Sequence, residues 1–164
     1  MIPPRKSATR KPTENPQDLR GGTPTNLKSL LAKLRNEARK RGLPANLMLL
    51  FYFQERFLAR VAVSQYRDSF ILKGGLNLYG RYGNAARPTR DVDLAGQNLS
   101  NTLEAVSAAV KEVASLELDD GVVFNTGNLQ GGEIIESATY TGIRIELIAR
   151  FEDAFETLQL DLSF

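Results

Sequence analysis

Residues 70–75 read Phe-Ile-Leu-Lys-Gly-Gly and residues 91–94 read Asp-Val-Asp-Leu, and these two stretches decide the fold. Alternate residues of a strand point to the same side and lie roughly 6.5 Å apart. Asp91 and Asp93 would therefore share one face, while Val92 and Leu94 enter the core. Two carboxylates on one face suit a divalent metal ion. An isolated Asp-X-Asp pair is more often a solvated strand face, so the interpretation depends on what precedes it.

What precedes the acids is a short apolar segment, two glycines and a short helical segment. Phe70–Leu72 reads as a buried strand, and residues 76–82 predict a short helix. Gly74 and Gly75 allow a tight turn and a close approach of the backbone to a phosphate. Lys73 stands directly before that turn. Glycines, cations and paired acids together indicate nucleotide chemistry.

This order of motifs resembles the nucleotidyltransferase core, although the fifteen residues between the glycines and the first acid are at or beyond the long end of that pattern. With its flanks, the sequence resembles the AbiEii/AbiGii family more narrowly. The resemblance covers roughly residue 25 to the C-terminus and is carried by Gln-Glu-Arg-Phe-Leu-Ala-Arg at 54–60, Ser-Gln-Tyr-Arg-Asp-Ser-Phe-Ile-Leu-Lys-Gly-Gly at 64–75 and Arg-Pro-Thr-Arg-Asp-Val-Asp-Leu at 87–94. These proteins are nucleotidyltransferase toxins of bacterial toxin–antitoxin and abortive-infection systems.

The resemblance implies an α+β fold with a polymerase-beta-like core, in which N-terminal helices pack on a mixed or antiparallel sheet. It also implies a third metal carboxylate on a later strand, and Asp161 is the matching position. The local pattern agrees, because residues 157–164 alternate between polar and apolar side chains. An ordinary polar-face aspartate remains the alternative for Asp161 taken alone.

The expected site follows from these residues. Asp91, Asp93 and Asp161 would hold one or two Mg²⁺ ions, with Mn²⁺ as the other candidate, and Asp161 would help to activate the acceptor hydroxyl. The expected nucleotide-binding residues are Lys73, Gly74, Gly75, Thr89 and Arg90. The alternatives are a plain turn for the glycines, a surface position for Lys73, and ion pairing to the acids for Arg90. Arg87 has a weaker claim of the same kind.

Composition restricts the chemistry. The chain has no Cys and no His, so thiolate or imidazole ligands and the usual neutral-pH general base are excluded. No apolar run is long enough to cross a bilayer, which favours a cytoplasmic location. Residues 1–43 hold 11 Lys and Arg against 3 Asp and Glu, whereas the remainder holds 10 against 16. The basic end could contact nucleic acid or an acidic partner, or it is an ordinary solvated tail.

The predicted elements form a single domain. Residues 1–22 are predicted to be a disordered basic tail, and residues 23–164 the nucleotidyltransferase core. Thr23 and Pro24 should begin a helix that ends at Gly42, and Asn101 with Glu104 should cap another. A second helix is predicted at 44–63. Strands are predicted at 122–124, 134–140, 143–149 and 158–162, with a tight turn at Thr141-Gly142.

The resemblance implies transfer of a nucleotide from an NTP to an acceptor such as tRNA, together with a cognate antitoxin protein. Family members continue beyond this last strand into a largely helical half, whereas this sequence stops at Phe164. The sequence is therefore expected to be truncated relative to the family, and to transfer nucleotides weakly. The alternative function is a catalytically impaired module that binds nucleotide, RNA or antitoxin.

Overall fold

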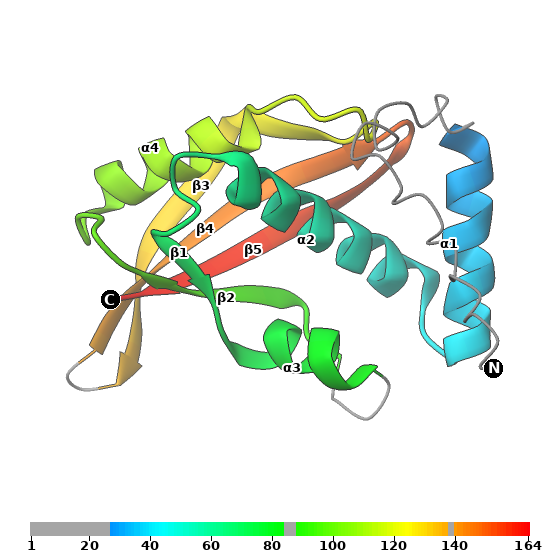
Figure 1. Cartoon of the computed structure of the whole chain (residues 1–164), viewed down its shortest axis with the longest axis horizontal. Helices are drawn as coiled ribbons and strands as arrows, with labels where there is room; N and C mark the ends of the chain where they lie inside the picture. Colours follow the sequence, from blue (N-terminus) through cyan, green and yellow to red (C-terminus); the bar gives the residue numbers. More distant parts are fainter. Residues whose placement is uncertain (1–26, 84–87, 138–139) are drawn as a thin grey trace, which may run out of the picture.

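The computed structural model describes residues 27–83, 88–137 and 140–164. In this part of the chain four helices and five strands build an α+β domain (Figure 1). The helices are α1 (Leu27–Arg41), α2 (Ala45–Val63), α3 (Gly74–Tyr82) and α4 (Leu103–Ala114). The strands are β1 (Phe70–Leu72), β2 (Asp91–Gly96), β3 (Val123–Ser137), β4 (Tyr140–Phe151) and β5 (Ala154–Ser163). The predicted tail and the predicted cap at Thr23 and Pro24 lie outside the described residues.

The strands form one mixed sheet in the order β1-β2-β5-β4-β3. Strands β2 and β5 run parallel, and the other neighbours run antiparallel. The α+β class and the mixed sheet are therefore confirmed. This order places β2 beside β5, so side chains from two distant parts of the sequence meet on adjacent strands.

One face of the sheet carries the apolar core. Helices α2 and α4 lie across this face, while α1 packs mainly on α2 (Figure 1). The buried side chains at the centre are Phe53, Phe57 and Val61 of α2, Val106, Val110 and Val113 of α4, Ile143, Ile145 and Leu147 of β4, and Leu158, Leu160 and Leu162 of β5. The alternating residues of β4 and β5 point to the opposite face, where polar side chains gather. Among the described helices, none is both long and apolar enough to span a membrane.

A buried ion pair joins α2 to the segment between α4 and β3. The Arg60 guanidinium donates to both carboxylate oxygens of Asp120, at 2.8 and 3.1 Å. It also donates to the carbonyl oxygens of Leu116 and Val122, each at 2.9 Å. These bonds compensate for the removal of both charges from water, since the two side chains are only 2% and 6% exposed. Arg60 thus ties α2 to the segment that leads from α4 into β3.

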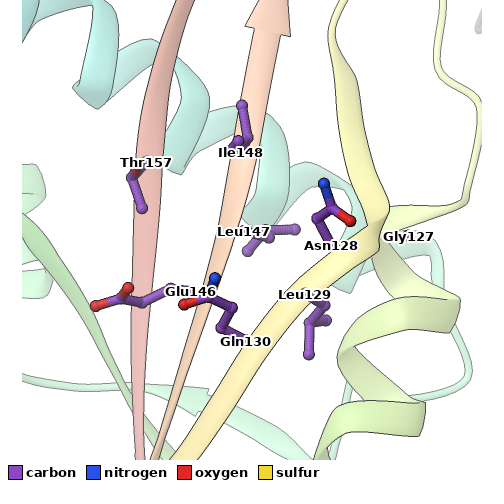
Figure 2. Close-up of a pocket in the computed structure, with 8 residues that line it drawn as sticks. All are labelled: Gly127, Asn128, Leu129, Gln130, Glu146, Leu147, Ile148 and Thr157. Carbon is purple, nitrogen blue, oxygen red and sulfur yellow. The ribbon is translucent and has the colours of Figure 1, made fainter.

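Strand β3 combines two predicted strands and bulges away from β4. The pair Asn125–Ile148 is followed along the ladder by Gln130–Glu146, so four residues of β3 stand opposite Leu147 alone. Asn125 Oδ1 accepts a hydrogen bond from the Gly127 N–H at 3.1 Å, which turns the chain at the start of this bulge. A hollow opens between the two strands at this point (Figure 2).

The predicted turn at Thr141-Gly142 is wrong. Both residues lie in β4, where they pair with Ile135 and Ile134, and the pairing of β3 with β4 extends to Ser137 and Tyr140. Gly142 is needed inside the strand for space, because a Cβ there would lie 2.9 Å from the Leu162 carbonyl oxygen.

Two helix starts also differ from expectation. Helix α3 begins at Gly74 rather than at residue 76. Helix α4 is capped by Thr102 and not by Asn101: the Ala105 N–H donates to Thr102 Oγ1 at 3.3 Å. Glu104 then occupies the second helical position, one residue too early for a capping box. Gly42 ends α1 as predicted, with a φ of +65° and a bond from the Leu43 N–H to the Ala38 carbonyl.

Candidate functional site

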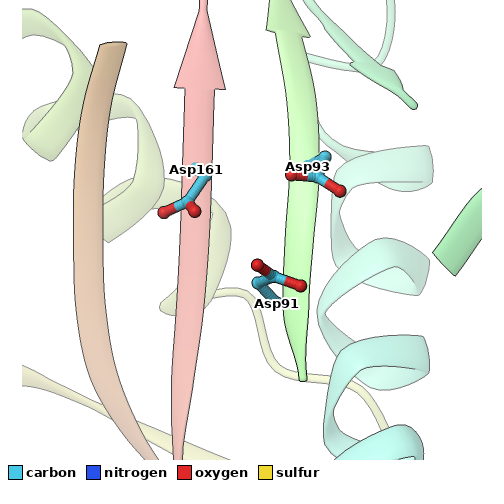
Figure 3. A group of neighbouring side chains, drawn as sticks. All are labelled: Asp91, Asp93 and Asp161. Atoms are coloured by element: carbon cyan, nitrogen blue, oxygen red, sulfur yellow. The ribbon is translucent and has the colours of Figure 1, made fainter. Parts of the chain in front are cut away.

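Three aspartates meet on the polar face of the sheet. Asp93 of β2 lies directly beside Asp161 of β5 in the parallel ladder, and Asp91 lies beside Gln159. Each of the three acids can offer one carboxylate oxygen such that all three oxygens lie within 4.8 Å of one another (Figure 3). The structure therefore brings together the acids that the sequence singled out.

Burial and mutual repulsion make this cluster electrostatically costly. Burial raises the pKa of Asp93 above its ordinary value, and the neighbouring charges of Asp91 and Asp161 raise it further. The Gly75 N–H, which donates to the Asp93 carboxylate, and the Lys73 ammonium oppose this rise in pKa. A site with this imbalance favours a cation.

The glycine turn at Gly74-Gly75 packs directly against the acids. Gly74 has a φ of +62°, and a Cβ at this position would lie 1.8 Å from Asp93 Oδ2. The Lys73 N–H also donates to the Asp93 carbonyl at 2.9 Å. Gly75 is crowded as well, because a Cβ there would lie 3.0 Å from the Thr89 Cβ. The turn therefore needs glycine for its backbone angle and for its contact with the acid strand.

The remaining predicted residues surround the cluster unequally. Lys73 Nζ donates to Ser163 Oγ at 2.6 Å, which holds the ammonium on the polar face beside β5. The Thr89 hydroxyl donates to the Asp91 carboxylate. Arg90 is exposed, and none of the ion pairs among the described residues includes it, so the predicted pairing of Arg90 with the acids is not observed. Arg87 lies outside the described residues.

Arg144 is the site residue that sequence reasoning missed. It lies on β4 beside Asp161, and its Nε and Nη2 donate to the two Asp161 oxygens at 2.8 and 2.7 Å. Gln159 Nε2 donates to the same carboxylate at 3.3 Å. Asp161 is thereby oriented from two sides while its side chain is only 8% exposed. Arg144 occupies one of the alternating polar positions of β4, like Glu146, but that signal alone does not name its partner.

The profile of one protein family matches residues 56–164, which include the glycine turn and all three acids. The family is described as the nucleotidyl transferase AbiEii toxin, of type IV toxin–antitoxin systems. The chain belongs to the AbiEii family. Among curated proteins, none gives a significant match to the chain.

A solved structure resembles this AbiEii chain in part. It is that of a candidate nucleotidyltransferase from H. pylori, with 19% sequence identity and a TM-score of 0.46. The alignment covers 74% of this chain and 46% of the other, so the AbiEii chain spans about half the length of that relative.

The donor atoms of Asp91, Asp93 and Asp161 suit a hard divalent cation. Their donors are carboxylate oxygens alone, which Mg²⁺ and Mn²⁺ prefer and which soft-metal sites lack. Arg144 engages both oxygens of Asp161, but each oxygen has a second lone pair that remains available for coordination. The spacing within 4.8 Å and the raised pKa of Asp93 both agree with a place that suits a divalent cation.

Proposed function

We propose that this chain is a divalent-metal-dependent nucleotidyltransferase that acts as the toxin of a toxin–antitoxin system and transfers a nucleotide from an NTP to RNA. The observation that carries the proposal is the meeting of Asp91, Asp93 and Asp161 beside the Gly74-Gly75 turn. Membership of the AbiEii family supports the nucleotidyltransferase and toxin parts of the proposal. The RNA acceptor, with tRNA as the first candidate, is our inference from the family resemblance.

The chemistry requires neutralisation of negative charge. An acceptor hydroxyl oxygen attacks the α-phosphorus of the NTP, the α–β anhydride bond breaks, and pyrophosphate leaves. Asp91, Asp93 and Asp161 would hold Mg²⁺ or Mn²⁺, which supplies the positive charge that aligns and neutralises the triphosphate. Asp161 would accept the hydroxyl proton on a carboxylate oxygen, while Arg144 keeps that carboxylate oriented.

The charged groups suggest how the triphosphate lies. Lys73 stands next to the glycine turn on the polar face and carries the positive charge that suits the departing pyrophosphate. Gly74 and Gly75 would bring the backbone close to the phosphates, and Thr89 would hold Asp91. Arg90 is exposed beside β2 and would contact a phosphate from solvent. The sugar and base of the NTP would extend away from Lys73 and the glycine turn.

Partners and location belong to the same proposal. A type IV toxin implies an antitoxin protein as partner, and its attack on RNA implies action in the cytoplasm. A binding module that retains the acids without transferring nucleotides is the competing function. The Arg144–Asp161 ion pair favours this alternative, because it supplies one acid with a cation that is not a metal.

The test is transfer of label from each of the four α-labelled NTPs to total bacterial RNA in the presence of Mg²⁺. We expect weak labelling of a discrete RNA band with the native chain and none with Asp91→Ala. Asp119→Asn is the matched control, because Asp119 is exposed in the loop after α4. Binding of NTP–Mg²⁺ without any transfer would replace the enzyme by the binding module. Equal transfer by Asp91→Ala would refute the three-acid site.

A further inference from the structure

The hollow at the β3 bulge lies on the same polar face as the acids. Its volume is about 540 Å³, within the range of small-molecule sites. Its lining consists of Gly127, Asn128, Leu129 and Gln130 of β3, Glu146, Leu147 and Ile148 of β4, and Thr157 of β5. Figure 2 shows Glu146 and Ile148 on β4 and Thr157 on β5, with Leu147 in the gap between β4 and β3.

The lining is polar but carries no cation. Asn128 and Gln130 offer amide donors and acceptors, Glu146 offers a carboxylate, and Thr157 offers a hydroxyl. Ile148 adds an apolar surface among them. Such a set suits the edge and face of a nucleobase, since amides pair with adenine and carboxylates accept from the amino group of cytosine. It does not suit a phosphate, because Glu146 would repel it.

The hollow and the glycine turn flank the acids on opposite sides. The turn follows β1 and lies next to β2, whereas the hollow lies over β3, β4 and the Thr157 end of β5. In the sheet order β1-β2-β5-β4-β3 these are opposite sides of the acids, which stand on β2 and β5. Along β5, Thr157 and Asp161 are four residues apart on one face, which is roughly 13 Å. Along β4, Glu146 lies two residues after Arg144 and therefore on the same face, and Arg144 contacts Asp161.

The in-line geometry of phosphoryl transfer assigns these two sides. The attacking oxygen and the leaving oxygen lie on opposite sides of the reacting phosphorus. If pyrophosphate leaves toward Lys73 and the glycine turn, the acceptor must approach from β5 and β4, which is the side of the hollow. We propose that the hollow binds one of the last two bases of the RNA acceptor, with Gln130 and Glu146 contacting the base edge and Ile148 its face. This inference rests on the proposed function.

The test measures RNA binding separately from transfer. A short single-stranded RNA with a 5′ fluorescent label is compared with the same RNA in which the last two nucleotides keep their sugar and phosphate but lack the base. Binding is measured by fluorescence anisotropy at fixed Mg²⁺. We expect base removal to weaken binding to the native chain roughly tenfold or more, since one well-formed base contact has about that effect. The double variant Gln130→Leu, Glu146→Gln should bind both RNAs nearly equally. This comparison cancels the general gain in affinity that follows from removing a negative charge.

Glu117→Gln is the control, because it removes one exposed negative charge from the segment after α4 and should keep the native difference between the two RNAs. Melting curves establish that each variant folds. If the native chain transfers nucleotides but the double variant still distinguishes the two RNAs, this inference fails and the proposed function stands. If the base effect disappears in the double variant but no transfer occurs, the hollow is an RNA site of a binding module. If no RNA binds the hollow, the inference is refuted and a protein hydroxyl becomes the acceptor to test.

Discussion

Substitution of Gly74 by Ala should displace the Asp93 carboxylate, although Gly74 is not itself one of the three acids. The added Cβ would lie 1.8 Å from Asp93 Oδ2 and 2.5 Å from its Cγ, far inside van der Waals contact. The backbone cannot absorb the conflict cheaply, because Gly74 has a φ of +62°, where an L-residue is strained by roughly 1–2 kcal/mol. The Asp93 carboxylate must therefore rotate away from its neighbours, or the turn must open.

We expect two measurable effects. The free energy of unfolding should fall by about 1–2 kcal/mol from the backbone strain. Affinity for Mn²⁺, measured by calorimetric titration, should fall roughly 10–100-fold, as it does when a group that orients a metal ligand is lost. Denaturant unfolding with EDTA present measures the first effect without the metal.

Gly80→Ala is the control from the same helix. A Cβ at Gly80 meets no atom within 4 Å, and Gly80 lies in the last turn of α3. This variant should gain about 0.5–1 kcal/mol of stability and keep its Mn²⁺ affinity. The reasoning is refuted if Gly74→Ala retains native Mn²⁺ affinity while its stability falls, because the contact with Asp93 would then have no bearing on metal binding.

Three other substitutions test the charge interactions of the acid cluster and of the buried Arg60–Asp120 ion pair. Asp93→Asn should weaken Mn²⁺ binding. In EDTA, the native chain should lose stability as pH rises from about 3.8 through the raised folded pKa of Asp93, and pH-dependent melts of the variant should lack that loss. Arg144→Gln should lower metal-free stability by about 1–2 kcal/mol, because Asp161 loses its charged partner while the guanidinium was itself partly exposed. Saturating Mg²⁺ should restore part of this loss in thermal melts, and no restoration would place Asp161 outside the metal site. Arg60→Met should cost roughly 3–5 kcal/mol in urea unfolding by stranding Asp120, and the double variant with Asp120→Leu should recover much of it.

Strand alternation was sufficient to place Asp91 and Asp93 on one face, because a period of two depends only on local geometry. It was also sufficient to give Asp161 a polar face of its own strand. It could not place that strand beside β2, since neither alternation nor composition fixes strand order. The resemblance to the AbiEii family supplied that adjacency, and the parallel ladder between Asp93 and Asp161 agrees with it.

Arg144 was missed because its role depends on register. Its partner is set by the β4–β5 hairpin, in which Phe151 pairs with Ala154 and the pairing then proceeds to Arg144 and Asp161. That hairpin turns through Glu152, a non-glycine residue with a φ of +51°, so the usual Asn-Gly or Gly-Gly signal is absent. Thr141-Gly142 carries a stronger turn signal, but its glycine serves close packing against Leu162.

Each acid of the cluster has a partner from a different part of the fold. Asp91 accepts from Thr89, Asp93 accepts from the Gly75 N–H, and Asp161 is held by Arg144. These bonds fix the direction of three carboxylates that would otherwise turn away from one another. The three carboxylates are therefore already oriented in the protein alone, and a divalent cation that bound there would require little reorganisation of them. Because two of the three partners are neutral, most of the repulsion remains, and this residual repulsion is what a divalent cation would relieve.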